Sequence, residues 1–141
     1  MTELSEHIID WADPTTEFFW NAAREQRRVI QQCAACHSYQ FYPRPFCLSC
    51  DSDAIEWVSA CGFGTVYSRT IVHLPAAPEL GLTSPYVAAI VELDEGPRLL
   101  TNLVSETCTI GSRVHVLWRP RKGQAPAPVF GPADDAGELR Q

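Results

Sequence analysis

Short apolar runs separated by polar turn residues make up much of the second half of the chain, and this pattern predicts β-structure. Val, Ile, Thr and aromatic residues gather in four runs that are separated by turn residues. We expect strands at Gly64–His73, Tyr86–Leu93, Arg98–Val104 and Arg113–Trp118. The sequence Asp94-Glu95-Gly96-Pro97 between the second and third run predicts a tight hairpin. Several short strands without helices, in about 60 residues, fit a small closed or partly closed barrel of the OB type.

The first half of the chain contains one helical pattern. Asp13 is suited to cap a helix and Pro14 to occupy its first position, where a missing N–H costs nothing. We expect this helix to end at about Arg27. Its apolar residues recur at helical spacing and form one face, at Phe18, Phe19, Ala22 and Ala23. Such a face has to pack against another part of the chain or against another protein.

Two pairs of cysteines follow the helix, with two residues between the members of each pair. They are Cys33 and Cys36, then Cys47 and Cys50. This spacing lets both sulfurs of a pair reach one ion, and four thiolates suit the tetrahedral shell of Zn²⁺. Short strands are expected around the pairs at Val29–Gln32, Tyr39–Tyr42 and Ile55–Val58. Because four Cys leave no open position for water or substrate, the predicted zinc is structural.

Two disulfides or a rubredoxin-like iron site are the alternatives to zinc. The first residues of the chain are acidic and no apolar segment follows, which differs from a secretory signal. We therefore expect a reducing cytoplasm, where paired Cys usually bind metal. Iron can bind the same four thiolates, but nothing else in the sequence indicates electron transfer. No apolar run approaches the roughly 20 residues of a membrane span, so no membrane contact is expected.

The residues that directly follow the two pairs are His37 and Asp51, where many such sites have Gly. Both residue types tolerate a left-handed backbone better than most. We expect His37 to be a surface residue and not a competing ligand, because the Cys set is already complete.

The net charge of −6 argues against a surface for nucleic acid, which would need a basic excess. All but one of the eleven cationic residues are Arg. They gather in two places, at Arg24, Arg27 and Arg28 and at Arg113, Arg119, Arg121 and Lys122. Arg side chains suit carboxylates and phosphates, so a small anionic ligand or an acidic protein fits, and a solvated face is the alternative. Pro43 and Pro45 enforce an extended turn that exposes Arg44.

The sequence contains no recognisable catalytic motif, neither a phosphate loop nor a nucleophile elbow nor a metalloprotease signature. The remaining thiols, Cys61 and Cys108, are predicted to be buried and inert. His73 and His115 are predicted to be packed in strands, and the carboxylates of the hairpin to be solvated. The expected organisation is a flexible leader (1–12), a helix and zinc-ribbon domain (13–60), an OB-fold domain (61–122) and a flexible tail (123–141).

Several motifs together resemble a known family. They are Phe19-Trp20-Asn21-Ala22-Ala23-Arg24, Gln32-Cys33 with Cys36, Tyr42-Pro43-Arg44-Pro45, Cys47 with Cys50, Gly64-Thr65-Val66-Tyr67-Ser68, Pro85-Tyr86-Val87-Ala88 and Glu92-Leu93-Asp94-Glu95-Gly96-Pro97-Arg98. Between roughly residues 17 and 118 the chain is similar to the small rubredoxin-type zinc-ribbon/OB-fold proteins that accompany thiolases. His37 and Asp51 stand where that family commonly has Gly. This departure bears on the backbone geometry of the Cys loops and not on metal binding.

The resemblance implies a mainly β protein with an N-terminal helix, a four-Cys zinc ribbon and an OB barrel. It also implies an accessory subunit whose catalytic partner is a thiolase or a lipid-transfer-type homologue that cleaves acyl-CoA substrates. If the chain contacts CoA, its phosphates need cations, and the candidates are Arg44, Arg119, Arg121 and Lys122. No catalytic residue is expected in this chain.

Two other functions remain open from the sequence. A stand-alone OB module that binds nucleic acid would stack bases on exposed aromatic residues among cations, and the acidic balance of the chain argues against it. An enzyme or acyl carrier would use Cys61 or Cys108 as its thiol. Activity of the isolated chain, lost on changing either Cys to Ser, would indicate this third function.

Overall fold

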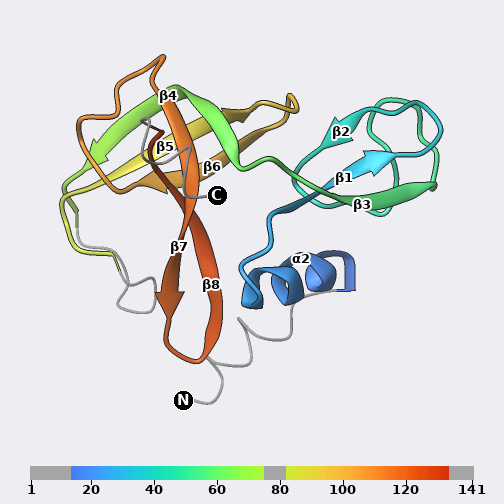
Figure 1. Cartoon of the computed structure of the whole chain (residues 1–141), viewed down its shortest axis with the longest axis horizontal. Coiled ribbons are helices and arrows are strands. Elements are labelled where there is room, and N and C mark those ends of the chain that lie inside the picture. Colours follow the sequence, from blue (N-terminus) through green and yellow to red (C-terminus); the bar gives the residue numbers. More distant parts are fainter. Residues whose placement is uncertain (1–13, 75–81, 134–141) are drawn as a thin grey trace. The chain divides into compact units, whose positions relative to one another are not determined.

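A computed structural model describes residues 14–74 and 82–133 of the chain (Figure 1). The chain divides into two compact units, one formed by residues 1–60 and 120–127 and the other by residues 61–119 and 128–141. The described residues form one helix and eight strands, so the predicted mainly β fold with an N-terminal helix is confirmed. The expected flexible leader and the last residues of the expected tail lie outside the described part. No helix in that part has the length and apolarity of a membrane span.

The first unit combines helix α2, Pro14–Arg24, with a three-stranded antiparallel sheet. Strand β1, Val29–Cys33, lies between β2, Tyr39–Gln40, and β3, Ile55–Ser59. The helix ends three residues before the predicted Arg27. Gln26 takes a positive φ of 57°, and Arg27 N–H donates to Ala22 O at 2.9 Å. This pattern is a Schellman cap, which stops the helix because a left-handed residue cannot continue it.

The core of this unit forms between the helix and the sheet. Phe19, Ala22 and Val29 are buried together, and Trp20, Phe41 and Trp57 pack against them. Phe18, which the sequence places on the same apolar face, is instead 44% exposed and stacks on Trp57 with 5.1 Å between ring centroids. The core is small, which is typical of a module that also depends on a metal.

The second unit contains a closed five-stranded barrel in the order β4-β5-β6-β8-β7. The strands are β4, Phe63–Val72, β5, Tyr86–Leu93, β6, Arg98–Leu103, β7, Arg113–Arg121, and β8, Gln124–Pro132. Alternate side chains point inward, as in β5, where Val87, Ala89, Val91 and Leu93 are buried. The predicted hairpin joins β5 to β6, with Glu92 opposite Arg98. Five strands closed in this order are the OB-fold that the sequence predicts.

Strand β8 corrects the predicted end of the barrel. The sequence predicts a flexible tail from residue 123, whereas Gln124–Pro132 form the strand between β6 and β7. Its Val129 and Phe130 are buried, and Val104 N–H donates to Phe130 O at 2.9 Å. The many Pro residues of this stretch suggested a tail because Pro cannot donate to a ladder. Here the strand contributes acceptors and buried side chains, which need no N–H from its prolines.

Candidate metal centre

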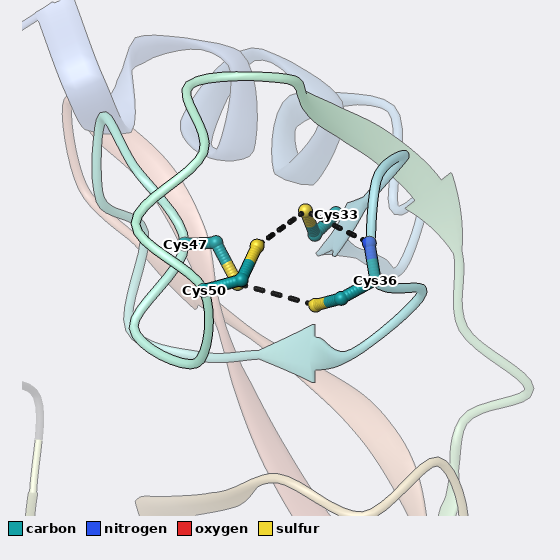
Figure 2. A group of neighbouring side chains, drawn as sticks. All are labelled: Cys33, Cys36, Cys47 and Cys50. Atoms are coloured by element: carbon teal, nitrogen blue, oxygen red, sulfur yellow. Dashed lines mark hydrogen bonds between the residues drawn. The ribbon is translucent and has the colours of Figure 1, made fainter.

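The four cysteines of the two pairs meet in the first unit. Cys33 ends β1, Cys36 lies in the turn that follows, and Cys47 and Cys50 lie in the connection between β2 and β3. Figure 2 shows their side chains pointing toward one another from these two loops. All four sulfurs lie within 4.8 Å of one another. The Cys33–Cys50 and Cys36–Cys47 sulfur pairs are each 3.6 Å apart.

These distances fit a metal and not a disulfide. A tetrahedral Zn²⁺ with Zn–S bonds of about 2.3 Å separates its sulfurs by about 3.8 Å, whereas a disulfide bond is about 2.05 Å long. All six cysteines of the chain are free thiols. Moreover, the short contacts join one pair to the other, which is how two knuckles share an ion. The four Cys can therefore hold one tetrahedral Zn²⁺.

The two Cys loops have the same backbone geometry. Ala35 N–H donates to the Cys33 sulfur and Ser49 N–H to the Cys47 sulfur, both at 3.3 Å. His37 and Asp51 each have φ of 67°, the left-handed backbone that these residue types tolerate better than most. Because both residues adopt the conformation that Gly usually supplies, the departure from Gly leaves the loops intact.

Hydrogen bonds within the cluster favour thiolates. The backbone N–H groups of Cys36 and Ala35 lower the pKa of Cys33, and the hydrogen bonds with Ser38 lower the pKa of Cys36 to about 6. The backbone of Ser52 acts in the same direction on Cys50, but burial and the other three sulfurs raise the pKa of Cys50 to about 12. Cys50 is therefore the hardest of these three thiols to deprotonate, because its thiolate would lie beside the negative charge of the other sulfurs. A bound cation reverses this effect, since a coordinating thiol is deprotonated outright.

The four cations predicted for CoA have different surroundings. Arg44 is exposed in the connection after β2, and Lys122 is exposed in the turn between β7 and β8. The guanidinium of Arg121 lies 5.0 Å from the ring centroid of Trp20, and its Nε donates to Ala125 O at 2.8 Å.

Arg119 is half-buried in the barrel unit, and burial lowers its pKa. Its Nη1 donates to Asn102 Oδ1 at 3.3 Å, while its Nε is buried without a partner among the described residues. Arg119 and Arg121 are thus partly engaged within the chain, whereas the charged groups of Arg44 and Lys122 are exposed.

The remaining candidates for chemistry differ from the sequence predictions. Cys108 is buried as predicted, but Cys61 is exposed. Partial desolvation of its sulfur, with the nearby carboxylates Glu95 and Asp94, raises the pKa of Cys61 although the residue is exposed, which disfavours a nucleophilic thiolate. The predicted packing of His73 is wrong, since it is exposed. Asp94 is exposed but not merely solvated, because Arg113 donates to both of its oxygens at 2.7 and 2.9 Å.

Gln31 and Gln40 are structural site residues that the sequence analysis missed. They lie opposite each other on β1 and β2 and are both buried. Their side-chain amides bind the backbone of the connection that leads to Cys47. In the sequence they are only long polar residues inside two short predicted strands. Their role can be recognised only once the strands are paired, because pairing places the two side chains next to each other.

The fold and the four-Cys cluster define a zinc-ribbon protein with an OB barrel. Residues 20–56 match the family described as ChsH2, rubredoxin-like zinc ribbon domain, and residues 57–119 match ChsH2, C-terminal OB-fold domain. A chain of the solved structure titled "Ltp2-ChsH2(DUF35) aldolase" is 40% identical with a TM-score of 0.78, over 87% of this chain and 98% of that one. The chain belongs to the ChsH2 (DUF35) family.

Two curated relatives are longer than the region that matches. The "Probable enoyl-CoA hydratase alpha subunit" of Thermomonospora curvata is 42% identical over 119 residues, which are 82% of this chain and 37% of that protein. The "3-oxo-4,17-pregnadiene-20-carboxyl-CoA hydratase alpha subunit" of Mycobacterium tuberculosis is 39% identical over 88 residues, 62% of this chain and 27% of that protein. The chain thus spans about a third or less of the length of these relatives.

Proposed function

We propose that this chain is an accessory zinc-binding subunit of an acyl-CoA enzyme complex. Its catalytic partner would be a thiolase-like, lipid-transfer-type subunit that cleaves a CoA ester by a retro-aldol reaction. The observation that supports this most is the 40% identity to a chain of the Ltp2-ChsH2(DUF35) aldolase, with 98% of that chain covered. The names of two relatives, both acyl-CoA hydratase subunits, support the same substrate class.

In this proposal the zinc is structural and the chemistry belongs to the partner. One Zn²⁺ is held by Cys33, Cys36, Cys47 and Cys50, whose four sulfurs complete its shell. Neither remaining thiol is suited to catalysis, since the pKa values of Cys61 and Cys108 are both raised, mainly by burial. The partner therefore supplies the nucleophile or general base. Retro-Claisen thiolysis is the alternative reaction for a thiolase-like partner. Identifying the products of the complex distinguishes thiolysis from retro-aldol cleavage.

A contact with CoA is a further part of the proposal. The cations at 119–122 are three Arg or Lys among four successive residues, and phosphates favour such a group. Lys122 is the exposed member, while Arg121 is positioned by Trp20 and Ala125. Arg44 is flanked instead by exposed aromatic side chains, Tyr42 and Phe46, which suit a protein surface better than phosphates.

The test is purification of the tagged chain from its native host, with intact-mass and metal analysis of one fraction. We expect a lipid-transfer-type catalytic chain in a fixed ratio, about one zinc per chain, and cleavage of an acyl-CoA ester by the complex only. Elution of the chain alone would refute the accessory role. With the complex in hand, Lys122→Ala should weaken CoA binding while Arg27→Ala, on an exposed side chain elsewhere, should not.

A further inference from the structure

A short stretch of the ribbon exposes more apolar surface than its surroundings require. We call residues 42–48, which connect β2 to the second Cys pair, the ribbon loop. Tyr42, Phe46 and Leu48 are 49%, 43% and 56% exposed. Apolar side chains gathered on one exposed segment typically mark an interaction site, whereas scattered ones do not. None of the three side chains is among the residues that form the core of the unit, which lies between α2 and the sheet.

The backbone of the ribbon loop is held in one conformation by two buried amides. Gln31 binds both backbone groups of Arg44, accepting from its N–H at 2.8 Å and donating to its carbonyl at 3.0 Å. Gln40 donates to Gln31 Oε1 at 2.9 Å and to Phe46 O at 3.1 Å, and accepts from Leu48 N–H at 3.0 Å. Pro43 and Pro45 add fixed φ angles on either side of Arg44.

These hydrogen bonds hold the ribbon loop more rigidly than a simple connection between two elements requires, and such rigidity is typical of a binding loop. A loop that only joins two elements can be solvated and needs no buried polar partners. Here two buried side chains are committed to holding three backbone positions of an exposed segment, and Cys47 anchors its end at the metal cluster. A rigid loop loses little conformational freedom on binding, which raises affinity.

The charge of the loop indicates what kind of surface it meets. Arg44 is the only Lys or Arg between Val29 and Ala60, and the exposed charges that follow are acidic, at Asp51, Asp53 and Glu56. Arg44 forms no ion pair within the part of the chain that the structure describes. One cation among acids does not suit a nucleic acid or another polyanion, which needs several. It suits a single carboxylate, which a guanidinium binds through two hydrogen bonds.

We propose that the ribbon loop is the docking element for the catalytic subunit, with Arg44 bound to a carboxylate that lies in an apolar depression of the partner. Tyr42 and Phe46 fill that depression beside the ion pair and exclude water from it. Arg and aromatic residues dominate the binding energy of protein interfaces, which is the composition found here. This inference rests on the proposed function, because it names the catalytic subunit as the occupant.

The test measures the affinity of the full-length, zinc-loaded chain for the catalytic subunit, which is isolated from the native complex and identified by its intact mass and by the acyl-CoA cleavage that returns when the two chains are recombined. The variants are Arg44→Ala and Phe46→Ser, with Arg27→Ala as the control because Arg27 is an exposed cation that pairs with Glu25. We expect Arg44→Ala and Phe46→Ser each to raise the Kd about 30-fold or more. The control should leave the Kd unchanged.

Two further measurements keep the outcomes separate. Zinc content and the unfolding temperature show whether each variant is folded. If Phe46→Ser is unfolded, the partner affinities of Arg44→Ala and Arg44→Lys test the docking role, because the Arg44 side chain is exposed and its replacement should leave the fold intact. Equal affinity of all variants would overturn the docking role and leave the proposed function intact. Loss of CoA affinity with unchanged partner affinity in Arg44→Ala would overturn it as well. If the wild-type chain bound no catalytic subunit, the proposed function and this inference would both be refuted.

Discussion

Gly64 shows how strongly one residue of the barrel depends on its neighbours. It is buried in β4, opposite Leu93 of β5. A Cβ atom at this position would lie 2.7 Å from both the Glu92 carbonyl oxygen and Val91 Cγ1. One of these neighbours is backbone within a paired strand, so it cannot move without disturbing the ladder. The two strands can approach this closely only because residue 64 has no side chain.

We therefore predict that Gly64→Ala destabilises the chain by about 1–3 kcal/mol, the usual cost of overpacking. The measurement is the free energy of unfolding of the zinc-loaded protein in denaturant. Ser68→Ala is the matched control, because Ser68 is exposed on the same strand, and we expect it to change stability by less than about 0.5 kcal/mol. Equal stability of the two variants would show that β4 and β5 are less closely packed than this structure has them.

At the scale of elements, the β5–β6 hairpin is joined to β7 by an ion pair. The carboxylate of Asp94, at the start of the hairpin turn, accepts two hydrogen bonds from Arg113 at the start of β7. Hydrogen bonding from Arg113 lowers the pKa of Asp94 below its ordinary 3.8. Both side chains are about half exposed, so the pair contributes on the order of 0.5 kcal/mol.

This geometry predicts a pH-dependent difference between the wild type and Asp94→Asn. A carboxyl whose pKa is lower in the folded state stabilises the fold above its unfolded pKa of 3.8, and loses that effect as the pH falls through the folded value. The wild type should therefore be more stable than the variant near neutral pH, and the difference should disappear as the pH falls below the lowered pKa of the folded state. Unfolding free energies measured at several pH values test this.

Glu106→Gln is the control for that series, because Glu106 is exposed in the same unit and forms no ion pair in the part of the chain that the structure describes. Its stability difference from the wild type should be close to zero at every pH. A difference for Asp94→Asn that grew toward acidic pH would contradict the assigned ion pair.

At the scale of the whole molecule, the two units are stabilised in different ways. The barrel closes on itself and buries the alternate side chains of its strands. The first unit has only a small core beside the helix, and its two Cys loops meet at the four-Cys cluster. Because few buried apolar groups compensate for ordering those loops, the ribbon should depend on zinc, as small metal-bound modules do.

We predict that Cys47→Ser reduces the zinc content from about one per chain to near zero and unfolds the ribbon, while the barrel keeps its β-structure. Cys47 is fully buried in the cluster, and a Ser hydroxyl is a much weaker ligand for Zn²⁺ than a thiolate. Metal analysis and circular dichroism of the same sample measure both effects. Cys61→Ser is the control, since Cys61 is an exposed thiol outside the cluster. Loss of the whole fold in Cys47→Ser would mean that the barrel also requires the metal.

Features of the chain that follow local rules could be predicted from its residues alone. The spacing of Cys33, Cys36, Cys47 and Cys50 predicted that their four sulfurs meet in one cluster, because two intervening residues let both sulfurs of a pair reach the same point. The short apolar run rich in β-branched residues predicted β5, whose expected ends, Tyr86 and Leu93, are those of the strand. The residue types at 37 and 51 are compatible with the left-handed backbone that the structure has at both positions.

Features that depend on partners distant along the chain became clear only in the folded protein. Gln124–Pro132 became a strand because β6 and β7 offer it a place in a closed barrel, although its composition is typical of a tail. The buried amides of Gln31 and Gln40 acquired their role because two strands are paired and a loop passes within hydrogen-bonding distance. Burial and hydrogen bonds between such segments are set by packing, and no local pattern specifies packing.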